Sequence, residues 1–236
     1  MINKNLEKIA IWGVPRSGTS WLGQIFNSSA HTRYCFQPLF SYAFKNGLSK
    51  FSSKGEINNF FHKISMSNDD FVVNGMSGSL DKSILSFKKK KITHIVMKHV
   101  RYLNIIKNLL HKCDNIKIIG IVRNPCAVLY SWFNAEKEFS NDWKPIVEWK
   151  NADKKNLKKE EEFFGYLKWK QVAYSFEELN KNKNFFLVNY NKLLTQTNDE
   201  IQSLFKFTNI EYTQQTINFI EKLILNYAFE QFFLFS

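Results

Sequence analysis

Apolar positions along the chain follow two alternating patterns. Short runs rich in β-branched residues predict strands, and longer stretches with apolar residues at helical spacing predict helices. The predicted strands are Ile9–Gly13, Phe71–Val73, His94–Val100, Ile116–Val122 and Phe185–Tyr190. The predicted helices are Thr19–Asn27, Tyr102–Lys112, Ala127–Lys137, Glu160–Lys181 and Asp199–Phe207. This alternation predicts an α/β fold: a three-layer sandwich with a central parallel sheet flanked by helices.

Length and composition fit one folding unit. The chain has 236 residues, of which 44% are hydrophobic, so it can bury one substantial core. We therefore predict a single domain over residues 1–236. Residues 136–162 are rich in Lys and Asn and predict an irregular insertion or a lid over a functional site.

The charge balance is strongly basic. Lys and Arg number 33 against 21 Asp and Glu, a net charge of +12. Such a charge attracts anionic ligands, acidic polymers or anionic membrane surfaces and does not choose among them. We interpret the Lys88–Lys91 run as a solvated loop before a strand. No nucleic-acid-binding motif accompanies the basic residues, so we predict no nucleic-acid partner.

Cysteine usage and the amino terminus bear on location. The three cysteines, Cys35, Cys113 and Cys126, have no paired spacing, so we expect neither disulfides nor a zinc site. The polar start of the chain predicts no signal peptide, and no apolar stretch approaches the roughly 18 residues of a membrane span. We therefore expect a cytoplasmic protein without a transmembrane segment. Its oligomeric state is not predicted.

A phosphate-binding loop follows the first predicted strand. The Gly13 to Gly18 spacing matches a P-loop, in which backbone amides and a helix N-terminus hold a phosphate. Thr19 stands where a nucleotide-hydrolysing enzyme carries its Lys. The strand Ile116–Val122 ends at Arg123, where such enzymes place a magnesium-holding Asp. Both features weigh against ATP or GTP, and they predict a site built from cations without a metal.

Two loops together resemble the sulfotransferase family. The segment Pro15–Trp21 resembles its 5′-phosphosulfate loop. Arg123, at the end of a strand, and Ser131, eight residues later, resemble the pair that grips the 3′-phosphate. Phe186–Leu187–Val188–Asn189 followed by Tyr190 is similar to the strand after which many members place a Tyr near the nucleotide.

The resemblance runs from about Ile9 to about Ile210, and it is greatest to bacterial members thought to modify carbohydrates. It implies the P-loop NTPase-like sulfotransferase fold. It also implies metal-independent transfer of the sulfuryl group of 3′-phosphoadenosine 5′-phosphosulfate (PAPS) to an acceptor hydroxyl, which we expect to belong to a saccharide. Residues 136–162 would then lie on the acceptor side.

The same resemblance assigns the nucleotide contacts. The backbone of Ser17, Gly18 and Thr19 would hold the 5′-phosphosulfate together with the hydroxyls of Thr19 and Ser20. Trp21 would stack on adenine, because an indole is a good platform for a flat π surface. The alternative for Trp21 is a place in the core.

Four residues are candidates for the reaction itself. Arg16 stands where cytosolic members have Lys and several others Arg, so we assign it the catalytic cation role. Carbohydrate enzymes commonly place a Glu before Pro, but here Gln37 precedes the Pro; it would orient an acceptor hydroxyl or be a loop residue. His99 is the predicted general base, although its register is shifted by one residue, and Lys98 is a second cation.

Other features leave alternatives open. The aromatic residues after Arg123 favour a core over contacts with sugar rings. The Glu160–Glu162 run predicts an exposed helix start. After Ile210 nothing resembles the late basic loop of the family; the aromatic stretch Phe219–Phe235 would pack on the sheet, touch a membrane surface or mark a shortened chain, and we predict packing.

Two other functions compete with sulfuryl transfer. A P-loop kinase would need magnesium. A catalytically weak or inactive binder of adenosine phosphates or acidic polysaccharide is suggested by Gln37 and by the atypical tail. The charge of Arg16 and the hydroxyls of the loop favour an enzyme.

Overall fold

The structure, a computed structural model, describes residues 6–75 and 85–223. The strands are β1 (Glu7–Trp12), β2 (Thr32–Phe36), β3 (His94–His99), β4 (Ile116–Val122) and β5 (Phe185–Asn189). The helices are α1 (Thr19–Ser28), α2 (Lys54–Met66), α3 (Asp70–Asn74), α4 (Ile106–Lys112), α5 (Pro125–Phe133), α6 (Pro145–Glu148), α7 (Asp153–Asn156), α8 (Tyr166–Leu179), α9 (Tyr190–Thr195) and α10 (Thr197–Phe207). Pro38–Phe40 and Leu103–Ile105 form single 3₁₀ turns.

The strands form one parallel sheet. Its order is β2-β3-β1-β4-β5, and every neighbouring pair runs parallel. The predicted α/β class is confirmed. Trp12 pairs with His99, and Phe36 pairs with Lys98, so the carboxyl ends of β1, β2 and β3 meet at one edge. Ligands of open parallel sheets bind beyond this edge.

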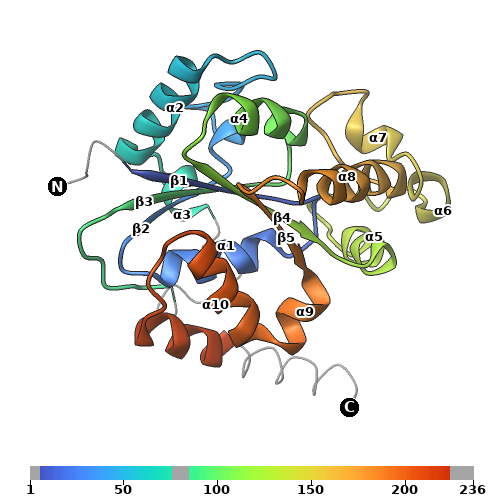
Figure 1. Ribbon diagram of the computed structural model, residues 1–236. Coiled ribbons are helices and arrows are strands. Elements are labelled where there is room, and N and C mark those ends of the chain that lie inside the picture. Colours follow the sequence, from blue (N-terminus) through green and yellow to red (C-terminus); the bar gives the residue numbers. More distant parts are fainter. Residues whose placement is uncertain (1–5, 76–84, 224–236) are drawn as a thin grey trace.

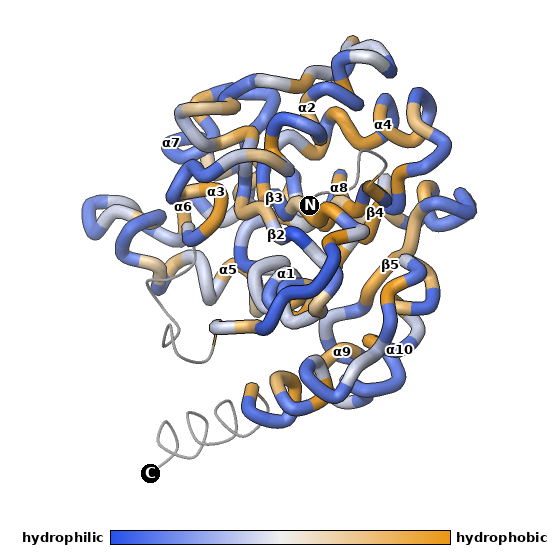
Figure 2. The backbone as a smooth tube through the Cα atoms, turned by 90° about the vertical axis from the view of Figure 1, so that its left-hand side faces the viewer, coloured by the Kyte–Doolittle hydropathy of each residue, from blue (hydrophilic) through white to orange (hydrophobic). Residues whose placement is uncertain are grey.

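Helices cover both faces of the sheet, with α2 and α4 on one side and α1 and α10 on the other (Figure 1). Alternate side chains of β1 explain this arrangement, because successive strand residues point to opposite faces. Ala10 and Trp12 pack into one buried cluster, and Ile9 and Ile11 pack into the other. Strands β4 and β5 consist mostly of hydrophobic residues (Figure 2).

One predicted strand was wrong, and two elements were missed. Phe71–Val73 lies in α3 and not in a strand, because the Asp69 side chain accepts a hydrogen bond from the Val72 amide (3.0 Å) and begins a helical turn. The missing strand is β2, a short edge strand. Helix α2 was also missed, although Ser53 and Glu56 form a complete capping box before it.

The Glu160–Glu162 run does not begin a helix. Helix α8 starts at Tyr166, and the Glu162 carboxylate forms a largely buried ion pair with Arg101 (2.7 Å). Segment 136–162 contains the short helices α6 and α7. Residues 88–91 lie in a loop before β3, as predicted, although the Lys89 ammonium donates to the Ser29 carbonyl (3.0 Å).

The aromatic tail is described only in its first part. Phe219, Ile220 and Leu223 are buried in the cluster that contains α1 and α10, which confirms packing as far as Leu223. The rest of Phe219–Phe235 lies outside the described residues. Within residues 6–75 and 85–223, no helix is long and apolar enough to cross a membrane.

Candidate active site

The loop from Gly13 to Gly18 is tightly packed against its surroundings. Gly18 has a φ of 96°, and a Cβ there would collide with the Tyr190 ring. A Cβ on Gly13 would collide with the Ser17 hydroxyl and with Ile121. Glycine is therefore needed at both positions, because neither has room for a Cβ, and at Gly18 the positive φ is a second reason.

Ser17 and Thr19 shape this loop from within. The Ser17 hydroxyl is buried and donates to the Val14 carbonyl (2.7 Å), and its amide donates to the same oxygen (3.2 Å). Thr19 begins α1 and is almost fully buried, whereas Ser20 and Trp21 are half-buried. The loop thus presents the N-terminus of α1 to the sheet edge, where its dipole favours an anion.

Arg123 and Ser131 lie directly against this loop. The Arg123 Nη1 donates to the Arg16 carbonyl (3.1 Å), and the Arg16 Nε donates to the Ser131 hydroxyl (3.0 Å). Helix α5, which carries Ser131, is positioned by the Asn124 side chain, which accepts from the Cys126 amide (2.9 Å). Residues from both sequence motifs are therefore brought together at one point.

Aromatic rings border the same point. The Arg123 guanidinium lies 4.6 Å from the centre of the Tyr190 ring, and Trp21 meets that ring edge-on at 6.2 Å. The Trp169 indole donates to the Arg123 carbonyl (2.9 Å). The sequence did not predict that Trp169 would hold the Arg123 backbone, because a lone Trp on a helix cannot be distinguished from a core residue by sequence.

Lys98 and Gln37 occupy the neighbouring strand ends. Lys98 is only 2% exposed, and its ammonium lies 4.5 Å from the centre of the Phe36 ring. Burial, with a smaller contribution from the charge of Arg16, lowers the pKa of Lys98 to about 7. The backbone N–H of Gln37 donates to the Lys98 carbonyl (2.9 Å). The side-chain oxygen Oε1 of Gln37 is buried and has no hydrogen-bond partner among the described residues.

His99 points to the other face of the sheet. Its ring is fully buried, stacks on Trp12 at 5.5 Å and meets Tyr102 edge-on at 6.4 Å. Burial, with a smaller effect from Lys98, holds the pKa of His99 well below its ordinary value. The imidazole is therefore neutral, and neither ring nitrogen has a hydrogen-bond partner in the part of the chain that the structure describes.

Glu138 adds a carboxylate that sequence analysis did not single out. Its Oε2 is buried without a hydrogen-bond partner within the described ranges. Its negative charge raises the pKa of Lys98 and of Lys155, against the lowering caused by burial. The only signal for Glu138 in the sequence was its place in the 136–162 segment.

Taken together, the arrangement is cationic. Within residues 6–75 and 85–223, no three His, Cys, Asp or Glu side chains converge where they could hold a metal ion. Arg16, Arg123 and Lys98 instead supply positive charge around one strand edge, next to a helix N-terminus. Such a site can bind a doubly phosphorylated anion and stabilise charge that develops during group transfer.

Comparisons with known proteins identify the family and agree with the fold. The family model described as "Sulfotransferase domain" matches residues 6–231. No functionally curated protein matches the sequence. The mouse sulfotransferase SULT7A1 complexed with PAP has a similar structure: the TM-score is 0.58 at 15% identity, over 94% of this chain and 63% of the mouse chain. This chain therefore spans less than two thirds of the mouse structure.

Two further structures are similar. A sulfotransferase from Alicyclobacillus acidocaldarius has a TM-score of 0.53 at 10% identity, over 96% of this chain and 93% of that one. Retinol dehydratase in complex with androsterone and inactive cofactor PAP has a TM-score of 0.53 at 14% identity, over 92% of this chain and 64% of that one. At these identities the structural likeness concerns the fold.

Proposed function

The chain belongs to the sulfotransferase domain family, and on this premise we propose that it transfers the sulfuryl group of PAPS to the hydroxyl of an acceptor. The observation that carries the proposal is the meeting of Arg16, Arg123, Ser131 and Tyr190 beside the phosphate loop. A kinase would instead require a magnesium ligand near the end of β4, where this chain has Arg123.

The proposed donor site has two anion-binding parts. The amides at the start of α1, with the hydroxyls of Thr19 and Ser20, would bind the 5′-phosphosulfate. Arg123 and Ser131 would bind the 3′-phosphate, which needs the Ser131 hydroxyl to exchange its hydrogen bond with Arg16. Trp21 and Tyr190 would border the adenosine.

The proposed reaction is an in-line displacement. The acceptor oxygen forms a bond to sulfur, the bond from sulfur to the 5′-phosphate oxygen breaks, and adenosine 3′,5′-bisphosphate (PAP) leaves with the electron pair. Arg16 and Lys98 would stabilise the charge on the leaving oxygen. The proton of the acceptor hydroxyl passes to a base, and no metal takes part.

The proposed acceptor is a saccharide or glycoconjugate. Gln37 Oε1 and Glu138 Oε2 are buried acceptors whose hydrogen bonds are unmade among the described residues. An acceptor with several hydroxyl donors would satisfy both oxygens, and buried polar groups otherwise cost free energy. Residues 136–162, which carry Glu138, would cover this acceptor side.

We expect turnover to fall as pH rises through about 7, because Lys98, with a pKa of about 7, then loses the charge that stabilises the leaving oxygen. Lys98→Arg should keep its charge and remove this alkaline decline, and Lys98→Met should be slow at every pH. A pH profile of kcat/KM checks this. An unchanged alkaline decline in Lys98→Arg would assign it to another group.

The proton acceptor is tested by two matched variants. His99→Ala is predicted to lose most turnover, by about 100-fold or more for a general base, while PAP affinity is unchanged. Glu138→Gln keeps the shape of a second candidate and removes its negative charge. If turnover stays near normal in His99→Ala and instead falls by about 100-fold in Glu138→Gln, the general base is Glu138 and not His99.

The proposed function itself is tested by transfer of labelled sulfuryl from PAPS in the presence of EDTA. Acceptors would include oligosaccharides, a steroid alcohol and retinol. We expect labelled saccharide and one PAP released per sulfate transferred. Activity only with ATP and magnesium would favour a kinase, and PAP binding without transfer to any acceptor would favour an inactive binder.

A further inference from the structure

The segment from Lys144 to Lys159 has inverted polarity. On α6, Ile146 is 80% exposed and Val147 is 63% exposed. The one acidic residue of that helix, Glu148, is buried instead, and its carboxylate accepts from the Lys154 amide (3.1 Å). An ordinary surface helix buries its apolar residues and exposes its charged ones.

The next turn repeats the inversion. Asn156, on α7, is buried, donates to the Phe164 carbonyl (3.0 Å) and accepts from the Phe164 amide (3.0 Å). The neighbouring Leu157 is exposed. Polar side chains here hold the backbone together, and aliphatic side chains face outward. We name Ile146, Val147, Trp149 and Leu157 the apolar tip.

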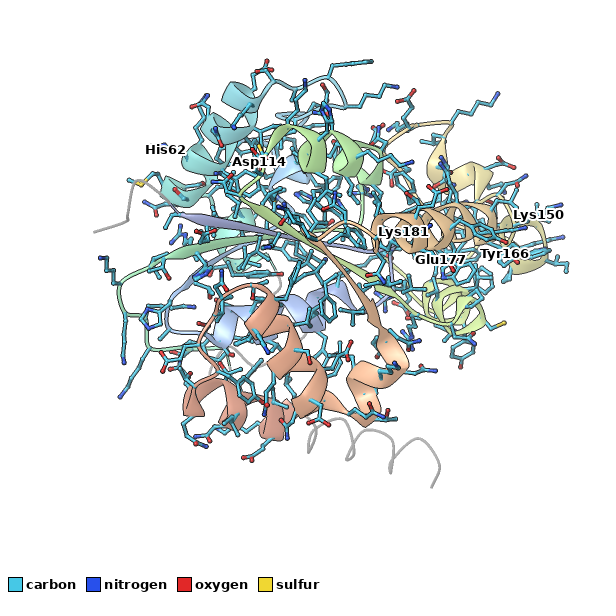
Figure 3. The ribbon with its side chains drawn as sticks, in the orientation of Figure 1. His62, Asp114, Lys150, Tyr166, Glu177 and Lys181 are labelled. Carbon is cyan, nitrogen blue, oxygen red and sulfur yellow. The ribbon has the colours of Figure 1, made fainter. Side chains whose placement is uncertain are left out.

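The tip is anchored to α8 and therefore displays its side chains in a defined arrangement. The Tyr166 amide donates to the Trp149 carbonyl (2.8 Å), and the Leu167 amide donates to the Lys150 carbonyl (3.0 Å). Helices α6 and α7 lie at one outer end of the molecule, and Lys150 and Tyr166 mark that end (Figure 3).

The segment that carries the apolar tip is rich in positive charge. The stretch 144–159 contains the lysines Lys144, Lys150, Lys154, Lys155, Lys158 and Lys159. All of them except Lys155 are exposed, and the acids of the stretch are the buried Glu148 and the exposed Asp153. The outward surface thus combines aliphatic and aromatic side chains with excess positive charge.

We propose that the apolar tip docks on an anionic lipid surface, with its aliphatic side chains entering the headgroup boundary and its lysines contacting lipid phosphates. This combination is typical of interfacial membrane binding. An acidic polysaccharide would use the lysines, but it offers nothing apolar to Ile146 and Val147. A second copy of the chain, with its own charge of +12, would be repelled.

An aromatic chain joins the tip to the proposed nucleotide site. Trp149 lies 5.8 Å from Tyr166, and Tyr166 stacks on Trp169 at 5.9 Å. The Trp169 indole in turn donates to the Arg123 carbonyl (2.9 Å). The docking surface therefore lies on the same end of the molecule as the site, which suits an acceptor held at a membrane.

The test is sedimentation of the full chain with phosphatidylcholine vesicles, with and without phosphatidylglycerol, at physiological ionic strength. We expect binding only to the anionic vesicles. The double variant Ile146→Ser with Val147→Ser, called the serine variant, should bind anionic vesicles about tenfold more weakly. The double variant Lys144→Gln with Lys150→Gln should lose about as much affinity. Met66→Ser is the control, because Met66 is 58% exposed near Lys63 at the end of α2, a helix that lies away from α6 and α7 (Figure 1).

PAP binding measured on the same variants shows that each is folded, and it does not depend on the vesicles. The proposal is overturned if the wild type does not bind anionic vesicles, if the serine variant binds like the wild type, or if Met66→Ser loses as much binding as the serine variant. It is also overturned if a soluble polyanion is bound equally by the wild type and the serine variant while vesicles are not.

Discussion

Arg16→Gln is expected to lower the rate of sulfuryl transfer by about 100- to 1000-fold, the usual effect of removing one preorganised donor to developing charge. Arg16 is exposed, follows β1 and has a φ of 70°. Its Nε donates to the Ser131 hydroxyl (3.0 Å), a bond that Ser131 would exchange for the 3′-phosphate, which frees the guanidinium to face the leaving oxygen. Gln keeps a hydrogen-bond donor at about the position of Nε and removes the charge.

The matched control is Arg16→Lys, which keeps the charge and loses the forked geometry. We expect it to retain considerably more activity than the Gln variant. The measurement is kcat under saturating PAPS, with PAP affinity measured alongside. PAP affinity should fall about tenfold or less, because much of the charge that Arg16 stabilises develops only during transfer. An equal loss of kcat in both variants would show that the charge is not what matters.

Arg123→Ala is expected to weaken PAP binding by about 100-fold, the effect of losing charge-assisted hydrogen bonds to a phosphate. The guanidinium is held between the Arg16 carbonyl (3.1 Å) and the Tyr190 ring (4.6 Å). Its position at the end of β4 places it where the 3′-phosphate is proposed to lie.

Binding of 5′-AMP separates that role from a general effect on the loop. PAP differs from AMP by the 3′-phosphate, so the wild type should bind PAP much more tightly than AMP. The Arg123→Ala variant should bind the two ligands about equally. Its affinity for AMP should be nearly that of the wild type. Calorimetric titration measures both ligands. A parallel loss of AMP affinity would mean that Arg123 supports the phosphate loop and does not recognise the 3′-phosphate.

The main features of the fold could be predicted because the buried strands are apolar and continuous. β4 was predicted with its observed bounds, Ile116–Val122. β2 could not be predicted, because it is an edge strand of only five residues and begins with the polar pair Thr32-Arg33. It is a strand because it pairs with β3. At α3 a strand was predicted where none exists. The Asp69 side chain caps a helical turn there, although the apolar run Phe71–Val73 is typical of a strand.

For the site, sequence analysis identified residues whose types and spacing carry chemistry, and the structure brings Arg16, Arg123, Ser131 and Tyr190 together. Glu138 and Trp169 were not identified, because their relevance comes only from tertiary contacts. His99 and Lys98 are adjacent in sequence but face opposite sides of the sheet. Their predicted roles therefore depend on the variants above.

The most direct test of sulfuryl-donor recognition is calorimetric titration of the wild type with PAP, with and without EDTA, beside titration with ADP and magnesium. We expect micromolar PAP binding that EDTA does not change, and much weaker binding of ADP, which has no 3′-phosphate. Binding of ADP that requires magnesium, together with no binding of PAP, would contradict the account and indicate a kinase-like nucleotide site.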